Sequence, residues 1–320
     1  MKRFLKKIAK VLFTFFLGLI AFVFIVHFTM KQTAEFSISE NYNYLILGHS
    51  HPECAFNDSL IPNFKNLSNS GESYFYTYHK VKELIPKNNI DAIFIEYSNS
   101  LIRKNMDEWI WGYEKMNAYF PWHSPFMKND DIWYLYKNNP DDFTKVVSTS
   151  TRNNFTRIIS LDFITTDKKY GGFNKLEESK IPELLKEINT NPTKAQEEGI
   201  SIANLTYLDK IIEYCRTNNV KVYLVRSPQH KYFPRENEDE LFKIKNEQFG
   251  DIDFLDFDKF PLKDNQFGDL GHLNYKGANV FSSWFNSLIE NGLLSIDDKK
   301  TLIEKEIENL TKTNSSSENL

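Results

Sequence analysis

The sequence predicts an α/β fold, in which helices cover both faces of a parallel β-sheet, with a helical insertion and an N-terminal transmembrane helix. Short apolar runs typical of buried strands alternate with stretches of helical periodicity over most of the chain. The alternation lapses over residues 100–200, which indicates the insertion. The first thirty residues combine a basic cluster with an unbroken apolar run, the pattern of a membrane anchor.

Composition narrows the class of protein. With 41% hydrophobic and 15% aromatic residues among 320, the chain is too apolar to be disordered. Its 39 basic and 43 acidic side chains give a net charge of −4, which argues against a nucleic-acid partner. Only Cys54 and Cys215 are present, which excludes a disulfide scaffold and a four-thiolate zinc site; both are predicted to be buried and reduced.

Residues 11–30 predict a single transmembrane helix. They contain no carboxylate or lysine, and about 20 apolar residues in helical geometry span the ~30 Å hydrocarbon core. The basic cluster before them predicts a cytoplasmic N-terminus and an extracytoplasmic domain. A cleaved signal peptide is the alternative, but residues 27–32 offer no small-x-small site, which favours an uncleaved anchor. The cluster comprises Lys2, Arg3, Lys6, Lys7 and Lys10.

The rest of the chain is organised around one predicted α/β domain, residues 42–294, which follows a polar linker at residues 31–41. Residues 295–320 predict a charged helix and then a disordered tail from Thr311. Strands are predicted at residues 42–48, 64–67, 91–97, 220–225 and 251–257. Helices are predicted at residues 76–85, 202–217 and 275–291.

The insertion at residues 100–200 is rich in tryptophan and tyrosine and is predicted to be largely helical. Such a segment could cover an active site, and its aromatic rings could stack on sugars. The same rings could equally pack the insertion onto the sheet. The sequence is compatible with both interpretations.

Gly48-His49-Ser50-His51 directly follows the first predicted strand. In an open parallel sheet, ligands bind outside the carboxyl ends of the strands. A serine placed there, after a glycine that permits a sharp turn, projects its hydroxyl into that crevice. Because a free hydroxyl is a poor nucleophile, it needs a base to accept its proton.

Asp269-Leu270-Gly271-His272 supplies such a base between the last strand and the last helix. A spacing of three in a turn places the carboxylate beside the imidazole. Asp269 can then accept a hydrogen bond from one ring nitrogen and leave the other to face Ser50. The negative charge of a tetrahedral intermediate also needs donors, for which the backbone N–H groups of Ser50 and Gly71 and the amide of Asn99 are candidates.

The order Ser50, Gly71, Asn99 and Asp269-x-x-His272 resembles the SGNH (GDSL-like) hydrolase superfamily, over residues 42–99 and 220–292. The resemblance implies a flavodoxin-like sheet and acyl-ester chemistry without a cofactor. It implies that Ser50 is the nucleophile, His272 the general base and Asp269 its orienting acid. Ser50, Gly71 and Asn99 would form the oxyanion hole. The sequence departs from the family where His49 replaces the usual aspartate and where the block around Asn99 lacks its Gly-x-Asn-Asp form.

Membrane-anchored members of this superfamily often serve O-acylation of envelope polysaccharides, and this architecture looks similar. The resemblance therefore implies a cell-envelope glycan or another acyl ester as substrate, and a membrane-embedded acyl donor as partner. Hydrolysis and transfer both remain open. Possible substrate-binding side chains are His51, Arg226, Gln229 and His230.

Three alternatives remain. His49 and His51 have metal-ligand spacing, and Asp269 or His272 could complete a zinc site for metal-dependent hydrolysis. The chain could also be an inactive, membrane-tethered module that binds a glycan or a protein. Glu53 and Glu96 could pair as in glycosidases, although a structural hydrogen bond is expected of Glu96 because it lies in a strand.

Overall fold

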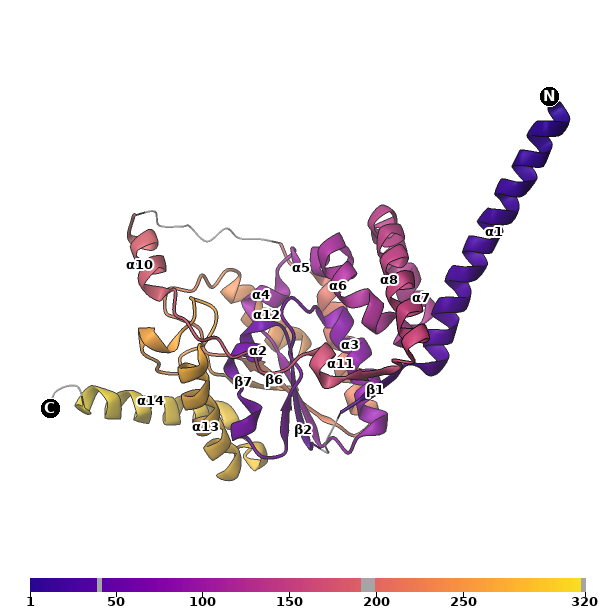
Figure 1. Cartoon of the computed structure of the whole chain (residues 1–320). Coiled ribbons are helices and arrows are strands. Elements are labelled where there is room, and N and C mark those ends of the chain that lie inside the picture. Colours follow the sequence, from indigo (N-terminus) through magenta and orange to yellow (C-terminus); the bar gives the residue numbers. More distant parts are fainter. Residues whose placement is uncertain (39–41, 191–198, 318–320) are drawn as a thin grey trace. The chain divides into compact units, whose positions relative to one another are not determined.

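The computed structural model describes residues 1–38, 42–190 and 199–317 (Figure 1). The chain divides into two compact units, each built from two stretches of sequence. Unit 1 comprises Met1–Ser37 and Trp111–Thr166. Unit 2 comprises Ile38–Ile110 and Asp167–Leu320.

Unit 2 is built on a five-stranded parallel sheet, which confirms the predicted fold class. Its strand order, β3-β2-β4-β6-β7, is the flavodoxin-like order in which the first strand lies between the second and the third. Each strand lies within or overlaps a predicted one. The strands are β2 (Tyr44–Leu47), β3 (Phe64–Asn66), β4 (Ala92–Glu96), β6 (Lys221–Arg226) and β7 (Asp253–Asp256).

Helices cover both faces of this sheet (Figure 1). On one face, Phe94 and Tyr223 pack with Phe281 and Phe285 of α13 (Tyr275–Glu290) in one buried cluster. Side chains alternate along a strand, so their neighbours point to the opposite face. There, α11 (Ile202–Thr217) packs on β6 and on α3 (Tyr74–Leu84). The apolar runs of the strands are therefore buried on both sides, as in other parallel sheets.

The carboxyl ends of the strands carry the polar loops of unit 2. β2 and β4 are adjacent, with Leu47 opposite Ile95, so the residues that follow these strands meet at the topological switch point. Short helices begin there: α2 (Ser50–Ala55) after β2 and α4 (Asn99–Ile102) after β4. Further helices of the chain are α5 (Met106–Trp111), α9 (Asp167–Tyr170), α10 (Ile181–Thr190), α12 (Glu238–Gln248) and α14 (Lys299–Ser317).

The C-terminal tail differs from its prediction. The sequence predicts disorder from Thr311, whereas α14 continues to Ser317. An ion pair between Lys312 and Glu308, one turn apart, supports this last part of the helix.

Unit 1 joins the N-terminal helix to the central part of the insertion. α1 (Lys2–Thr33) is longer than the predicted span and runs into the predicted linker, whose residues 35–37 form β1 rather than coil. β1 (Glu35–Ser37) pairs in parallel with β5 (Ile164–Thr166). The rest of the unit is helical, as predicted for the insertion; residues 39–41 and 191–198 lie outside the described residues. These helices are α6 (Tyr113–His123), α7 (Asn129–Asn138) and α8 (Pro140–Ser160).

Truncation of Phe285 tests the packing of α13 on the sheet. Its ring is fully buried, with the rings of Phe56 and Phe257 5.1 and 5.6 Å away. Phe285→Ala should lower the free energy of unfolding by about 3–5 kcal/mol. Val280→Ala, at an exposed position of the same helix, should change it by less than about 0.5 kcal/mol. Urea unfolding of the full chain in detergent measures both, and equal effects would contradict this packing.

Candidate active site

The turn after β2 presents Ser50 at the first residue of α2, with His49 as the helix N-cap. Gly48 is required in this turn because a Cβ there would lie 2.5 Å from both Cβ and Oε2 of Glu96. The β2–α2 connection therefore passes directly against the end of β4. Only glycine allows that approach, which agrees with the sharp turn that the sequence predicts.

Ser50, His272 and Asp269 form a continuous hydrogen-bonded chain. The Ser50 Oγ lies 2.7 Å from Nε2 of His272. The other ring nitrogen, Nδ1, lies 2.8 Å from Oδ1 of Asp269. The structure thus brings together the three side chains predicted to act as nucleophile, base and orienting acid, although Ser50 and His272 are 222 residues apart.

The loop that carries Asp269 and His272 is held by its own backbone. Oδ1 of Asp269 accepts the N–H groups of Gly271 and His272, at 2.8 and 3.0 Å. Asn274 caps α13 by accepting the N–H groups of Lys276 and Gly277. These backbone hydrogen bonds hold the Asp269 carboxylate in place independently of its contact with the imidazole. A rigid turn therefore orients the His272 ring.

The charge on Asp269 is stabilised in this loop. Burial alone would raise the pKa of Asp269, but hydrogen bonds from the His272 ring and from the N–H groups of Gly271 and His272 lower it below the usual aspartate value. Asp269 is therefore ionised at neutral pH. An ionised carboxylate at Nδ1 keeps the proton there and leaves Nε2 of His272 free to accept the Ser50 proton.

Two backbone N–H groups remain candidates for the oxyanion hole. Neither the N–H of Ser50 nor that of Gly71 donates to another group within the described residues. Two hydrogen bonds connect the loop with Gly71 to the segment around Ser50. The Asn69 N–H donates to the Gly48 carbonyl (3.0 Å), and the Ser70 hydroxyl donates to Glu53. Gly71 has a φ of 82°, which favours glycine there.

The prediction that the Asn99 amide is an oxyanion donor is wrong in this structure. Its Nδ2 donates to the Glu236 carbonyl (2.9 Å) and to Oε2 of Glu238 (2.7 Å), which uses both amide hydrogens. Its Oδ1 accepts from Arg226 at 3.3 Å. Asn99 therefore joins the loop after β4 to α12.

Of the four predicted substrate-binding residues, the structure brings His51 and Gln229 together. The Gln229 Nε2 lies 3.1 Å from Nδ1 of His51, whose ring centroid is 5.2 Å from that of His272. Arg226 and His230 are engaged by other side chains, and their role in substrate binding stays a prediction. Arg226 is buried and paired with Asp256 and Glu238, and both ring nitrogens of His230 are engaged, by Asp264 and by the Tyr232 N–H.

Glu96 makes the structural hydrogen bonds that the sequence predicts for it, and they connect it to the residues around Ser50. Its fully buried Oε2 accepts the His49 N–H at 2.8 Å, and its Oε1 lies 3.0 Å from both Nδ1 of His51 and the Ser98 hydroxyl. Burial alone would raise the pKa of Glu96, but the His49 and His51 imidazoles and the His49 N–H lower it to about 2. In the sequence, this network is visible as Glu96 at the end of one predicted strand and as His49 and His51 just after another predicted strand.

His49, His51 and Glu96 are also the residues that could hold a metal ion, since their ligand atoms lie within 4.8 Å of one another. The predicted metal ligands Asp269 and His272 are instead engaged with each other and with Ser50. Burial lowers the pKa of His49 to about 3, so its ring is neutral. Its Nε2 has no hydrogen-bond partner within the described residues, so one nitrogen of this cluster is free to bind a ligand.

Comparisons with known proteins add little to this geometry. A protein-family profile matches residues 169–294, less than half of the chain, and does not establish a family. No curated protein matches the sequence. Among solved structures, a proposed acylhydrolase from Bacteroides fragilis aligns with 87% of this chain and 94% of its own, at 9% identity and a TM-score of 0.32. Such low similarity does not carry that protein's activity over to this chain.

Replacement of Glu96 tests how much its buried carboxylate stabilises the turn that carries Ser50. Glu96→Gln should lower the free energy of unfolding by on the order of 2–4 kcal/mol at pH 7, because a buried carboxylate loses charge-assisted bonds. The folded-state pKa lies below the usual carboxyl value, so the difference from wild type should be full above about pH 5 and shrink as the pH falls towards 2.

Urea unfolding at several pH values measures this difference. Glu213→Gln is the control, since Glu213 is exposed and its ion pair with Arg216 should contribute less than about 0.5 kcal/mol. A Glu96→Gln effect that does not change with pH would show that Glu96 is not ionised in the folded protein.

Proposed function

We propose that this chain is a membrane-anchored, SGNH-type serine hydrolase or O-acyltransferase that acts on acyl esters. The hydrogen-bonded chain from Ser50 through His272 to Asp269, at the carboxyl end of a parallel sheet, supports this proposal most directly. It joins an activatable nucleophile to a base and the base to an orienting carboxylate, as nucleophilic acyl transfer requires.

The proposed reaction has two halves. His272 Nε2 takes the proton of Ser50 as its Oγ attacks the ester carbonyl. The negative charge on the tetrahedral intermediate falls to the N–H groups of Ser50 and Gly71, where one such donor typically lowers the barrier by about 3 kcal/mol. Collapse passes the proton from His272 to the leaving alcohol and forms an acyl-enzyme. Water or an acceptor hydroxyl then gives its proton to His272 and releases the acyl group.

The membrane anchor is part of the same proposal. α1 is the one described helix long and apolar enough to cross a bilayer, with a mean hydropathy of 2.6 over its most apolar stretch. The basic cluster at its start supports a cytoplasmic N-terminus, with the proposed catalytic unit outside the cytoplasm. In that location a cell-envelope glycan is an accessible acceptor, which is also what the family resemblance implies.

Hydrolysis of an aryl acetate by the purified chain tests the proposed nucleophile. Wild type should release the aryl alcohol, and Ser50→Ala should lose at least about 10³-fold in kcat because the acyl-enzyme cannot form. Ser283→Ala, at an exposed serine of α13, should leave the rate unchanged. A fluorophosphonate probe should label wild type and Ser283→Ala but not Ser50→Ala.

The same assay separates the alternatives. Activity that survives Ser50→Ala and is lost with a chelator would favour a metal at His49, His51 and Glu96 and overturn the serine mechanism. Absence of both turnover and labelling would favour an inactive binding module. A rate that rises with a glycan acceptor, with the acyl group recovered on the glycan, would identify a transferase.

Asp269→Asn tests the orienting carboxylate. The amide keeps the shape of the side chain but cannot stabilise a protonated His272, so kcat should fall about 10²–10⁴-fold while KM stays within a few-fold of wild type. Fluorophosphonate labelling should slow in parallel. A change in KM alone would show that Asp269 serves substrate binding rather than the imidazole.

A further inference from the structure

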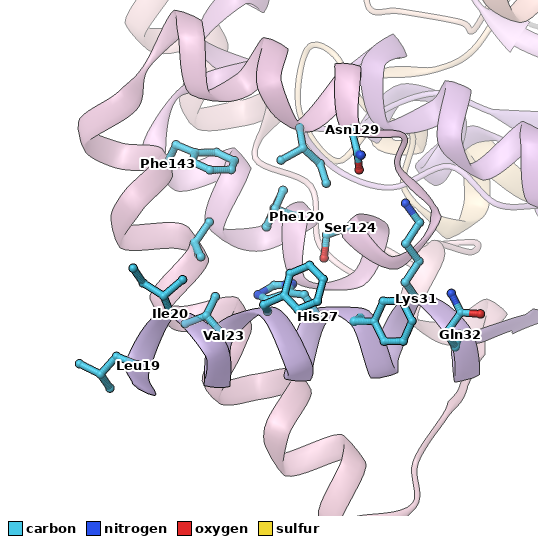
Figure 2. Close-up of a pocket in the computed structure, with 14 residues that line it drawn as sticks. Leu19, Ile20, Val23, His27, Lys31, Gln32, Phe120, Ser124, Asn129 and Phe143 are labelled. Carbon is cyan, nitrogen blue, oxygen red and sulfur yellow. The ribbon is translucent and has the colours of Figure 1, made fainter. Parts of the chain in front are cut away.

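Unit 1 contains a cavity of about 730 Å³ that none of the proposed chemistry uses (Figure 2). One wall is the C-terminal half of α1, and the others come from α6, the turn at Ser124, α7 and α8. The volume lies in the range of small-molecule sites. The wall formed by α1 extends from Leu19 to Gln32, about 20 Å along the helix axis.

The lining is apolar at one end and polar at the other. Along α1, Leu19, Ile20 and Val23 lie at one end of the cavity, and Lys31 and Gln32 lie at the other (Figure 2). The opposite walls follow the same order: Phe143 faces the apolar end, and Ser124 and Asn129 lie towards the polar end (Figure 2). The described lining residues include one cation, Lys31, and no carboxylate. A chain-like apolar body with an anionic head fits this polarity.

The α1 helix connects the cavity to the bilayer. Its exposed face from Val11 to Phe24 is apolar except for Thr14, and the last part of that face lines the cavity. Packing against α8 holds α1 in place, through a 3.0 Å contact between His27 Nε2 and the Thr151 hydroxyl and an edge-on contact between Phe22 and Phe155. A lipid chain can therefore pass from the membrane along α1 into the cavity without crossing a charged side chain.

We propose that this cavity binds one anionic membrane phospholipid, with an acyl chain against Leu19–Val23 and Phe143 and the headgroup phosphate at Lys31. The α1 wall is somewhat longer than one leaflet, whose acyl chains fill about half of the ~30 Å hydrocarbon core. The Lys31 ammonium, 3.3 Å from the Met127 carbonyl, is held at the polar end, where it can also pair with a phosphate. This inference rests on α1 as a membrane anchor, not on the chemistry at Ser50.

Photocrosslinking of the full chain in lipid nanodiscs tests the proposal. The nanodiscs carry a small fraction of phosphatidylglycerol with a diazirine in its acyl chain, and peptide mass spectrometry maps the adducts. Lipid in the cavity should label Ile132, Phe143 or Val147 as well as α1. Labelling confined to exposed α1 residues such as Phe13 and Phe16 would overturn the proposal, since any transmembrane helix gives that result.

Two substitutions sharpen the test. Val147→Trp fills the cavity and should reduce labelling of α7 and α8 at least 5-fold while labelling of Phe13 and Phe16 persists. Leu12→Trp, at an exposed position of α1 outside the cavity, is the matched control and should leave the cavity adducts unchanged. Circular dichroism melting checks that both variants fold, and Ile132→Trp replaces Val147→Trp if that variant melts early.

Lipid probes with different headgroups test whether Lys31 binds a phosphate. Phosphatidylcholine with the same diazirine chain should label the cavity less than phosphatidylglycerol, and Lys31→Gln should remove the difference. Equal labelling by these two lipids, or no effect of Lys31→Gln, would overturn the anionic headgroup. A free fatty acid with the same diazirine chain that labels the cavity more than phosphatidylglycerol would overturn the phosphate in favour of a carboxylate. Cavity adducts replaced by crosslinks between two copies of the chain would show that a second α1, rather than a lipid, fills the site.

Discussion

The site in unit 2 depends on one buried charge, the Glu96 carboxylate at the end of β4. An ionised carboxylate with no solvent contact is costly unless donors surround it. The donors here are the His49 N–H, the Ser98 hydroxyl and the His51 ring, and the first of these belongs to the residue before Ser50. The need to satisfy Glu96 therefore fixes the backbone from which the Ser50 hydroxyl projects. Gly48 is part of the same constraint, because any side chain there would displace the carboxylate.

The turn that carries Ser50 meets His272 because of the order of the strands in the sheet. β2 and β4 lie at the centre of the sheet, while the chain returns through β6 and β7 before Asp269 and His272. Aromatic packing holds α13 against the sheet, and Asn274 fixes where that helix begins. The His272 ring is thus positioned from one direction by the α13 cap and from the other by Asp269. Fold and candidate site share these contacts, so damage to the core under α13 also moves His272.

Elements that depend on the pattern of neighbouring residues could be predicted from the sequence. Apolar runs and helical spacing locate the five strands and helices such as α11, whose bounds match residues 202–217. The three side chains of the hydrogen-bonded chain could be found because their spacing and their positions after strands are visible in the sequence. The Asn- and Ser-rich composition from Thr311 predicts disorder because it carries no helical pattern, whereas α14 continues to Ser317.

The remaining features of the site and fold depend on contacts between side chains that are far apart in the sequence. Such contacts produce no pattern among neighbouring residues. Asn99 occupies the predicted place in the sequence, but the carboxylate of Glu238 and the carbonyl of Glu236 compete for its amide. Arg226 ends a strand beside the predicted crevice, yet Asp256 on the neighbouring strand neutralises it. The association of α1 with residues 111–166 was equally hidden, since it depends on which surfaces of the insertion are apolar.

The exposure of the base bears on the choice between hydrolysis and transfer. The His272 and Asp269 side chains are 25% and 38% exposed, so water can reach an acyl group on Ser50 from their side. Hydrolysis needs no further feature, because water at ~55 M competes with every acceptor. Transfer would need an acceptor held in place long enough to exceed that competition, through the high effective concentration that binding provides. Under the proposed mechanism, hydrolysis therefore requires only water at this exposed side of the site, whereas transfer requires an acceptor with sufficient affinity.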